Sequence, residues 1–446
     1  MNHDCICDRE HQSVLDLSNS GLTRLKKSFV NSSVITHVYL TDNDIWEIDE
    51  GAFDSLPNLV YLNLTGNLIS FDQLNFGDQS EIETLVLDNA IRNPAYKISN
   101  PRKSNYQCSG VNNFRVVSAD KANTIELKNN MKLPKLKKMY LRNNNIESIN
   151  EESMASLKEI MPNLTHLILG RNRISSVSFI KFLPSTVTDL FLHNNRISQF
   201  ESASLNNLKI LSLNENEIKN LCGSYGYCDG MTLKSAVNLE ILSISKVGLK
   251  KIESDSFEDL GNLLVLDMSF NKIDEILKHT FDNLTKLMIL KLDHNELVRL
   301  PDICGSKNLE SFSISHNKIK IIDKSISCLS KTKFMNLSNN IVDEINSEAF
   351  SSFVELEELD LSGNKLAILP DNWFPLKSNL QYLHLNNNSF TTLANMSLKK
   401  SKILRSLNVR KNPLRVINIK ILMDLLENTI VDIEERGYEQ CVVFKG

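Results

Sequence analysis

Glycine, proline and aromatic residues are scarce in this chain. Its 446 residues include 15 Gly, 10 Pro and 2 Trp, and aromatic residues make up 7%. Length alone suggests about three domains, yet no low-complexity or Pro/Gly-rich linker divides the sequence. Leucine, isoleucine, valine and phenylalanine are abundant, which excludes a disordered chain.

The sequence also has no long apolar run. No stretch reaches the roughly 18 apolar residues that a transmembrane helix needs, so we expect no membrane span in this chain. Its first ten residues, MNHDCICDRE, are polar, so a signal peptide either was removed or never existed.

Catalytic and metal-binding signatures are missing as well. There is no HExxH motif, no phosphate-binding glycine loop and no nucleophile elbow. No CxxC pair recurs, and no histidine has the spacing of a zinc ligand. We therefore expect a binding protein without cofactor or metal, and not an enzyme.

Asparagine is the residue in excess, at 52 positions. It is unfavourable in helix interiors and depleted in strands, which excludes a helical bundle, a coiled coil or a doubly wound enzyme with long helices. Its placement follows a repeated LxxLxLxxNxL string, as in NLLVLDMSFNKI and ELEELDLSGNKL. Sixteen copies put these residues in the asparagine column: Ser20, Asn43, Asn67, Ala90, Asn144, Asn172, Asn195, Asn216, Val247, Asn271, Asn295, Asn317, Asn340, Asn364, Asn388 and Asn412.

The repeat predicts an α/β solenoid of about sixteen turns. Each copy supplies one short strand and a return segment, and only stacking of neighbouring copies buries the leucines. A buried asparagine amide bonds backbone groups of its own turn and of the next one. The other asparagines are mostly loop residues and neighbours of this column, such as Asn143, Asn194 and Asn339.

The repeat resembles the extracellular leucine-rich repeat family, in its 24-residue subtype, from about residue 13 to residue 414. The subtype's convex-side phenylalanine is present at Phe53, Phe257, Phe281 and Phe350. The resemblance implies a horseshoe with a parallel sheet on its concave face, similar to Toll-type ectodomains and soluble insect leucine-rich immune proteins. It also implies a shortened N-terminal cap at 1–12. A C-terminal cap is expected at 415–446, with a short helix through Leu422–Leu426.

Two insertions interrupt the repeat, at about 91–130 and 217–238. The first is basic: between Lys97 and Arg142 there are eleven Lys or Arg and two acids, a net of +9. It either recruits an anionic ligand, such as an acidic protein, a sulfated glycan or a microbial polymer, or is a solvated loop; Arg102 and Lys103 are its candidate contacts. We do not expect nucleic acid, because interleaved aromatic residues are lacking and the pI is 6.2.

The eight cysteines predict an oxidising compartment. Cys222 and Cys228 can close a small loop, which either presents two tyrosines or caps one turn. Cys304 and Cys328 hold nearly equivalent places in adjacent repeats, within the range that a disulfide bridges. Four cysteines have no assigned partner, and a bond to a second chain in a homo- or heterodimer stays open for them: Cys5, Cys7, Cys108 and Cys441.

Seven N-x-Ser/Thr strings occur, about as many as the composition predicts by chance. Those at Asn63 and Asn336 fall within strands on the concave face, where a glycan would obstruct a ligand. The candidate glycosylation sites are Asn31, Asn163, Asn283 and Asn395.

The concave-face columns contain two candidate ligand surfaces. Four consecutive repeats present Ile210, Ile241, Val265 and Ile289 side by side, and such an apolar stripe indicates a partner site. Alternatively, β-branched residues simply suit strands, or the second insertion shields them. His166 and Asp189 are lateral neighbours without an adjacent nucleophile, so we interpret them as a surface contact. The early repeats supply the second cluster: Tyr39, Tyr61, Tyr140, Arg142, His166, Phe191 and His193.

We therefore predict a secreted or ectodomain recognition module, whose concave face and basic insertion bind a protein or a microbial glycan or lipid, in innate immunity. A cell-adhesion or guidance ectodomain is the alternative. A cytoplasmic scaffold, in which all eight cysteines are thiols, is the third hypothesis.

Overall fold

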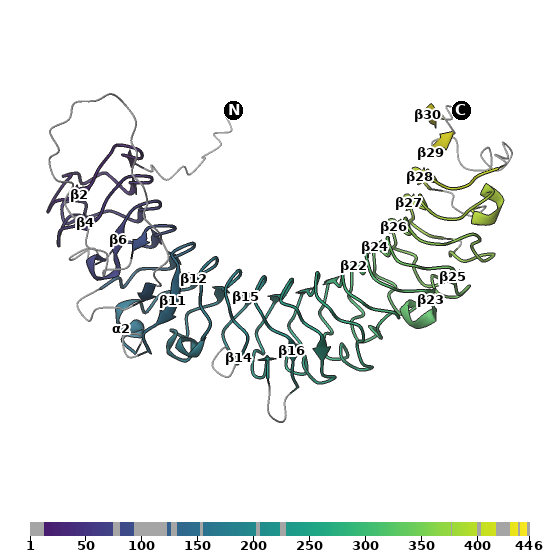
Figure 1. The fold of residues 1–446 in the computed structure, drawn as a ribbon, viewed down its shortest axis with the longest axis horizontal. Helices are drawn as coiled ribbons and strands as arrows, with labels where there is room; N and C mark the ends of the chain where they lie inside the picture. The colour runs from purple at the N-terminus through teal and green to yellow at the C-terminus, as the bar shows by residue number, and fades with distance from the viewer. Residues whose placement is uncertain are drawn as a thin grey trace, which may run out of the picture. The chain divides into compact units, whose positions relative to one another are not determined.

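The computed structural model describes residues 13–74, 81–92, 123–125, 132–151, 155–201, 206–223, 229–375, 377–398, 403–415, 429–435 and 438–443. The chain divides into two compact units, Met1–Ile197 and Ser198–Gly446. Each unit is a stack of turns with a parallel sheet on one side (Figure 1).

In the first unit, three-residue strands pair in parallel, each strand with the equivalent strand of the next turn. Thr84, for example, lies between Tyr61 and Lys138. These strands are β1 (Val14–Asp16), β3 (His37–Tyr39), β5 (Tyr61–Asn63), β7 (Thr84–Val86), β10 (Lys138–Tyr140), β12 (His166–Ile168) and β13 (Asp189–Phe191). The return segments hold β2 (Arg24–Leu25), β4 (Glu47–Ile48), β6 (Ile69–Ser70), β8 (Ile91–Arg92), β9 (Asn123–Ile125), β11 (Ile146–Ile149), η1 (Phe71–Gln73), α2 (Leu157–Ile160) and η2 (Ser178–Phe182).

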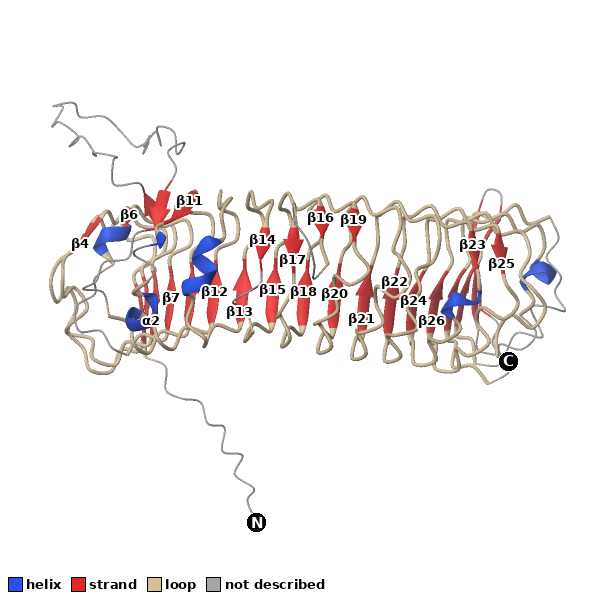
Figure 2. Cartoon of the chain, turned by 90° about the horizontal axis from the view of Figure 1, so that it is seen from below, coloured by secondary structure: helices blue, strands red, loops and turns tan. Residues whose placement is uncertain are grey.

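The second unit repeats this arrangement, and Figure 2 shows its sheet strands with the shorter strands of the return segments. The sheet strands are β15 (Ile210–Ser212), β18 (Ile241–Ser243), β20 (Val265–Asp267), β21 (Ile289–Lys291), β22 (Ser311–Ser313), β24 (Phe334–Asn336), β26 (Glu358–Asp360), β27 (Tyr382–His384), β28 (Ser406–Asn408), β29 (Ile430–Glu435) and β30 (Tyr438–Val443). The return segments hold β14 (Phe200–Glu201), β16 (Asn220–Leu221), β17 (Met231–Thr232), β19 (Lys251–Ile252), β23 (Ile321–Ile322), β25 (Glu344–Ile345), η3 (Lys324–Ile326) and η4 (Leu393–Met396).

The predicted solenoid is confirmed. Within the described residues, seven sheet strands up to β13 and nine from β15 to β28 match the sixteen repeats in the sequence. The helical part of the α/β solenoid is small, since the described helices span only three to five residues. No helix of the described part is long and apolar enough to cross a bilayer.

Buried asparagines hold each turn to the one before it. In Asn271, Nδ2 donates to the carbonyl oxygens of Ile244 and Met268, both at 2.9 Å. Its Oδ1 accepts from the backbone N–H groups of Val247 and Leu249 at 3.0 and 3.1 Å. One side chain therefore satisfies several buried backbone groups of two neighbouring turns.

The residue before each column position adopts a left-handed backbone conformation. Asn143, Asn194 and Asn339 have φ of 59°, 55° and 53°, and Gly363 has φ of 65°. Asparagine and glycine tolerate this region better than most residues. The left-handed turn thus explains the column-neighbour asparagines that the sequence pattern leaves unexplained.

The convex-side phenylalanines are buried as the resemblance implies. Phe53, Phe257, Phe281 and Phe350 are at most 1% exposed, and the rings of Phe257 and Phe281 stack at 5.8 Å between centroids. Side-chain burial of this kind supplies the main stabilising term of each turn.

The second insertion adds a strand that the sequence pattern did not predict. Strand β17 lies between β14 and β16, and all three run parallel. Phe200 N donates to Gly230 O at 3.0 Å, and Cys222 N donates to Met231 O at 2.8 Å. A Cβ on Gly230 would lie 2.2 Å from the Asn220 carbonyl oxygen, so this close approach requires glycine.

The sheet also continues beyond the last asparagine of the column. Strand β29 pairs in parallel with β28, and β30 returns antiparallel to β29. Alternating burial of Val431 and Ile433 is the pattern of a strand with one face on the core. The expected helix through Leu422–Leu426 lies outside the described residues.

Candidate functional site

The predicted apolar stripe forms one row on the sheet of the second unit. Strand pairing places Ile210 beside Ile241, Ile241 beside Val265, and Val265 beside Ile289. The four side chains are half-buried rather than fully exposed, because strands about 4.8 Å apart let neighbouring side chains cover one another. Met288, at the edge of this row, is 37% exposed.

Strands of the second insertion belong to a separate four-stranded sheet of the same unit. The insertion strands β16 and β17 pair with β14 and β19, not with the strands that carry the stripe. These described residues of the insertion therefore do not cover the stripe. At the sheet edge, Lys209 Nζ pairs with Glu240 Oε1 at 2.8 Å.

A row of three rings follows the stripe at the left-handed positions of three consecutive repeats, and sequence reasoning missed it. Phe270 and His294 stack with centroids 4.2 Å apart, and His294 and His316 stack at 4.0 Å. All three have positive φ, which is uncommon for residues with bulky side chains. Phe270 is 48% exposed, and the ammonium of Lys246 lies 5.6 Å from its ring centroid.

Stacking changes the titration of the middle ring. Burial lowers the pKa of His294, the neighbouring His316 lowers it further, and Asp293 partly opposes both effects.

We expect His294 to titrate below the 6.5 of an ordinary histidine, and H316Q to raise its pKa because the second imidazolium is removed. NMR titration of the imidazole protons measures both values. A pKa of His294 that is the same with and without His316 would contradict the stacked arrangement.

The predicted aromatic cluster in the first unit is assembled from adjacent strands. The Tyr61 ring lies 5.4 Å from His37 and 5.2 Å from Tyr39, between centroids. Burial, and then the nearby Tyr39, raises the pKa of Tyr61. Arg142 packs 5.5 Å from the Tyr140 ring centroid while its guanidinium pairs with Asp88 at 2.8 Å.

Phe191 and His193 extend this cluster. Phe191 lies beside Ile168 on the neighbouring strand. A Cβ on Gly170 would lie 2.2 Å from an imidazole carbon of His193, so the ring packs directly over the glycine backbone. Phe191 and His193, both predicted to contact a ligand, therefore lie on the strands and turns that follow Tyr140 in the same sheet.

His166 and Asp189 form a contact of 3.6 Å, as their lateral positions predicted. The Thr165 hydroxyl bonds His166 Nδ1 at 2.7 Å, and the Thr188 hydroxyl donates to Asp189 at 2.5 Å. Apolar Ile168 and Phe191 follow on the same strands, and the hydroxyls that contact the pair belong to the threonines that precede His166 and Asp189 in the chain. Nor do those residues contain three His, Cys, Asp or Glu side chains grouped as metal ligands.

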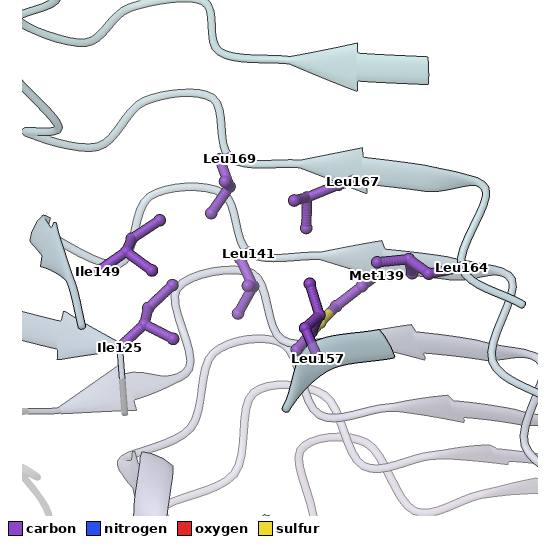
Figure 3. A pocket seen from close by; sticks show the side chains of 8 residues that line it. All are labelled: Ile125, Met139, Leu141, Ile149, Leu157, Leu164, Leu167 and Leu169. Carbon is purple, nitrogen blue, oxygen red and sulfur yellow. The ribbon is translucent and has the colours of Figure 1, made fainter. Parts of the chain in front are cut away.

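A small cavity of about 20 Å³ lies beneath β10 and β12 (Figure 3). It is far smaller than the roughly 300 Å³ of a ligand pocket, which makes it a packing defect of the core. All its lining side chains are apolar: Ile125, Met139, Leu141, Ile149, Leu157, Leu164, Leu167 and Leu169.

The structure changes the interpretation of the basic segment. Lys135, Lys137 and Arg142 pair with Glu81, Glu83 and Asp88 of the preceding turn, at 2.7 to 2.8 Å. A count along the sequence misses these acids because they lie 54 residues earlier in the chain. Part of the net +9 is thus neutralised locally. Arg102 and Lys103 lie outside the described residues.

Cys304 and Cys328 form the predicted disulfide, with Cα atoms 5.5 Å apart. Cys222 is also disulfide-bonded. Its predicted partner Cys228 lies outside the described residues, as do Cys5, Cys7 and Cys108.

Of the candidate glycosylation sites, Asn31, Asn163 and Asn283 are exposed and Asn395 is half-buried. Asn163 belongs to a second asparagine column that the sequence analysis did not separate from loop residues. Its Nδ2 donates to the Pro134 carbonyl oxygen of the preceding turn at 2.7 Å. The same bond, at 2.6 to 2.8 Å, is made by Asn58, Asn238, Asn262 and Asn308.

Comparison with known proteins adds the family. A model described as leucine rich repeat matches residues 13–69, 33–89, 237–297, 285–342, 307–366 and 355–414, more than half of the chain. Podocan of Mus musculus is 24% identical over 438 residues, which cover 94% of this chain and 63% of podocan. Toll-like receptor 3 of Boselaphus tragocamelus is 26% identical over 291 residues, covering 61% of this chain and 30% of the receptor. The chain thus spans less than two thirds of either relative.

Among solved structures, a leucine-rich repeat protein of Leptospira interrogans has the same fold. It superposes with a TM-score of 0.67 at 23% identity and covers 94% of this chain and 95% of its own.

Proposed function

Because the chain belongs to the leucine-rich repeat family, we propose that it is an extracellular recognition module that binds a protein ligand without catalysis. The observation that carries this proposal is the row of Ile210, Ile241, Val265 and Ile289, which strand pairing places side by side on one sheet face. A contiguous apolar row on such a face is typical of a partner site.

The disulfides support the extracellular setting. Cys304 with Cys328, and the bonded Cys222, require an oxidising compartment to persist. Innate immunity is the finer proposal, supported by the likeness to Toll-like receptor 3. Peptide mapping of the native protein under non-reducing conditions tests the compartment, and free thiols at both Cys304 and Cys328 would contradict it.

We expect Ile241→Asp to weaken binding of the protein ligand at least tenfold, because it buries an unpaired carboxylate in the apolar contact. A screen against secreted and cell-surface proteins identifies the ligand, and surface plasmon resonance measures its affinity.

Ile321→Asp is the matched control. Ile321 is 44% exposed on β23, which pairs with β25 in a separate two-stranded sheet, so its substitution should leave affinity unchanged. A ligand that binds Ile241→Asp and Val265→Asp as tightly as the wild type would overturn the assignment of this face.

A further inference from the structure

Two exposed aromatic side chains flank a glutamate farther along the same row. Phe334, Glu358 and Tyr382 occupy one register position on the neighbouring strands β24, β26 and β27. Phe334 is 46% exposed and Tyr382 is 39% exposed. Because adjacent strands are about 4.8 Å apart, the backbones bearing the two rings are about 10 Å apart, with the carboxylate between them.

The electrostatic surroundings of the two rings are negative. Lys333 pairs with Glu310 at 3.0 Å, and this hydrogen bond is the main cause of the raised pKa of Lys333. Glu355 and Glu357 raise it further. With Glu358, the residues named above comprise four carboxylates and one lysine ammonium.

The chemistry of the three side chains determines which kind of ligand side chain fits between them. An apolar side chain placed over Glu358 would desolvate the carboxylate without pairing it, which is unfavourable. An acidic segment would be repelled by the same charge. An arginine satisfies both features, because its planar guanidinium stacks on aromatic faces and pairs with a carboxylate.

We propose that Phe334, Glu358 and Tyr382, together the cation site, bind an arginine-containing basic segment of a protein partner. This inference rests on the proposed recognition role of the sheet face and names the chemistry of the partner. His384 Nε2 lies 3.5 Å from Glu358 Oε1, and the aromatic side chains on either side of Glu358 are exposed.

The cation site continues the apolar row. Ile289, Ser311 and Phe334 follow one another on adjacent strands. A partner that lies along the row therefore meets the apolar stripe first and the cation site about two strands later.

The test uses the full 446-residue chain and a fluorescein-labelled peptide of alternating glycine and arginine. A peptide with citrulline in place of arginine is the neutral control, and fluorescence anisotropy measures binding. We expect the arginine peptide to bind and the citrulline peptide not to bind.

Glu358→Gln should weaken binding about tenfold, since it removes a charge-assisted hydrogen bond. Phe334→Ala and Tyr382→Ala should each weaken it about two- to fivefold, as expected for lost cation–π contacts.

Glu344→Gln is the matched control, because it removes the same charge from exposed Glu344 on β25, in the two-stranded sheet of β23 and β25. Equal weakening by Glu344→Gln and Glu358→Gln would overturn the cation site in favour of unspecific attraction. So would unchanged binding by Phe334→Ala and Tyr382→Ala, or equal binding of the citrulline peptide. The peptide assay is independent of the natural ligand, so its failure is distinguishable from a failure of the Ile241→Asp experiment.

Discussion

Replacing Asn295 by leucine is expected to lower the free energy of unfolding by about 1 to 3 kcal/mol, because a buried backbone N–H loses its described hydrogen-bond partner and two carbonyl oxygens each lose one of their two side-chain donors. Nδ2 of Asn295 donates to the carbonyl oxygens of Met268 and Leu292, both at 3.0 Å. Its Oδ1 accepts from the Ile273 N–H at 3.1 Å. A leucine fills the space but leaves the buried Ile273 N–H without this bond, which is destabilising by about 1 to 3 kcal/mol. The two carbonyl oxygens keep their bonds from Asn271 Nδ2 and Asn317 Nδ2.

Urea unfolding followed by circular dichroism measures the difference. Asn308→Leu is the control, because the bond from half-buried Asn308 to the Thr285 carbonyl oxygen is exposed and water can replace it. Its expected effect is about 0.5 kcal/mol or less. Equal unfolding midpoints for the two variants would refute the structural role of the buried asparagine column.

Removing the disulfide between Cys304 and Cys328 is expected to lower the free energy of unfolding by about 3 kcal/mol. The bond joins residues 24 positions apart, and a loop of this size restricts the unfolded chain by roughly that amount. The bond also ties two neighbouring turns together close to η3.

Calorimetry of Cys304→Ser, Cys328→Ser and the double variant checks this expectation. Since either single substitution breaks the bond, all three variants should lose similar stability, with no additive effect in the double variant. A double variant that unfolds at the wild-type temperature would show that the cross-link does not stabilise the fold.

Local sequence was sufficient for the features that repeat. The asparagine column and the flanking leucines predict the strand of each turn, because one turn is nearly the same physical environment as the next. The register that places Ile241 beside Val265 follows from the same spacing. For this reason the stripe and the link between Cys304 and Cys328 were both predictable before any coordinates.

The candidate surfaces were predictable only in part. Tyr39, Tyr61 and Tyr140 were named from their strand positions, but the pairing of Arg142 with Asp88 was not, since the two residues belong to turns separated by an insertion. The ring row of Phe270, His294 and His316 was missed for another reason. These three residues lie in left-handed turns after the strands. The alternation of side chains along a strand gives no information about such turn positions.

By itself, the sequence determined the solenoid, its approximate number of turns, the face on which each strand residue lies and one disulfide. These properties follow from the LxxLxLxxNxL repeat, whose copies and spacing can be read directly from the sequence. Tertiary structure alone decided where the exceptions go: strand β17 between β14 and β16, the hairpin of β29 and β30, and the acids that neutralise part of the basic segment. Each depends on contacts between turns that a residue-by-residue pattern does not contain.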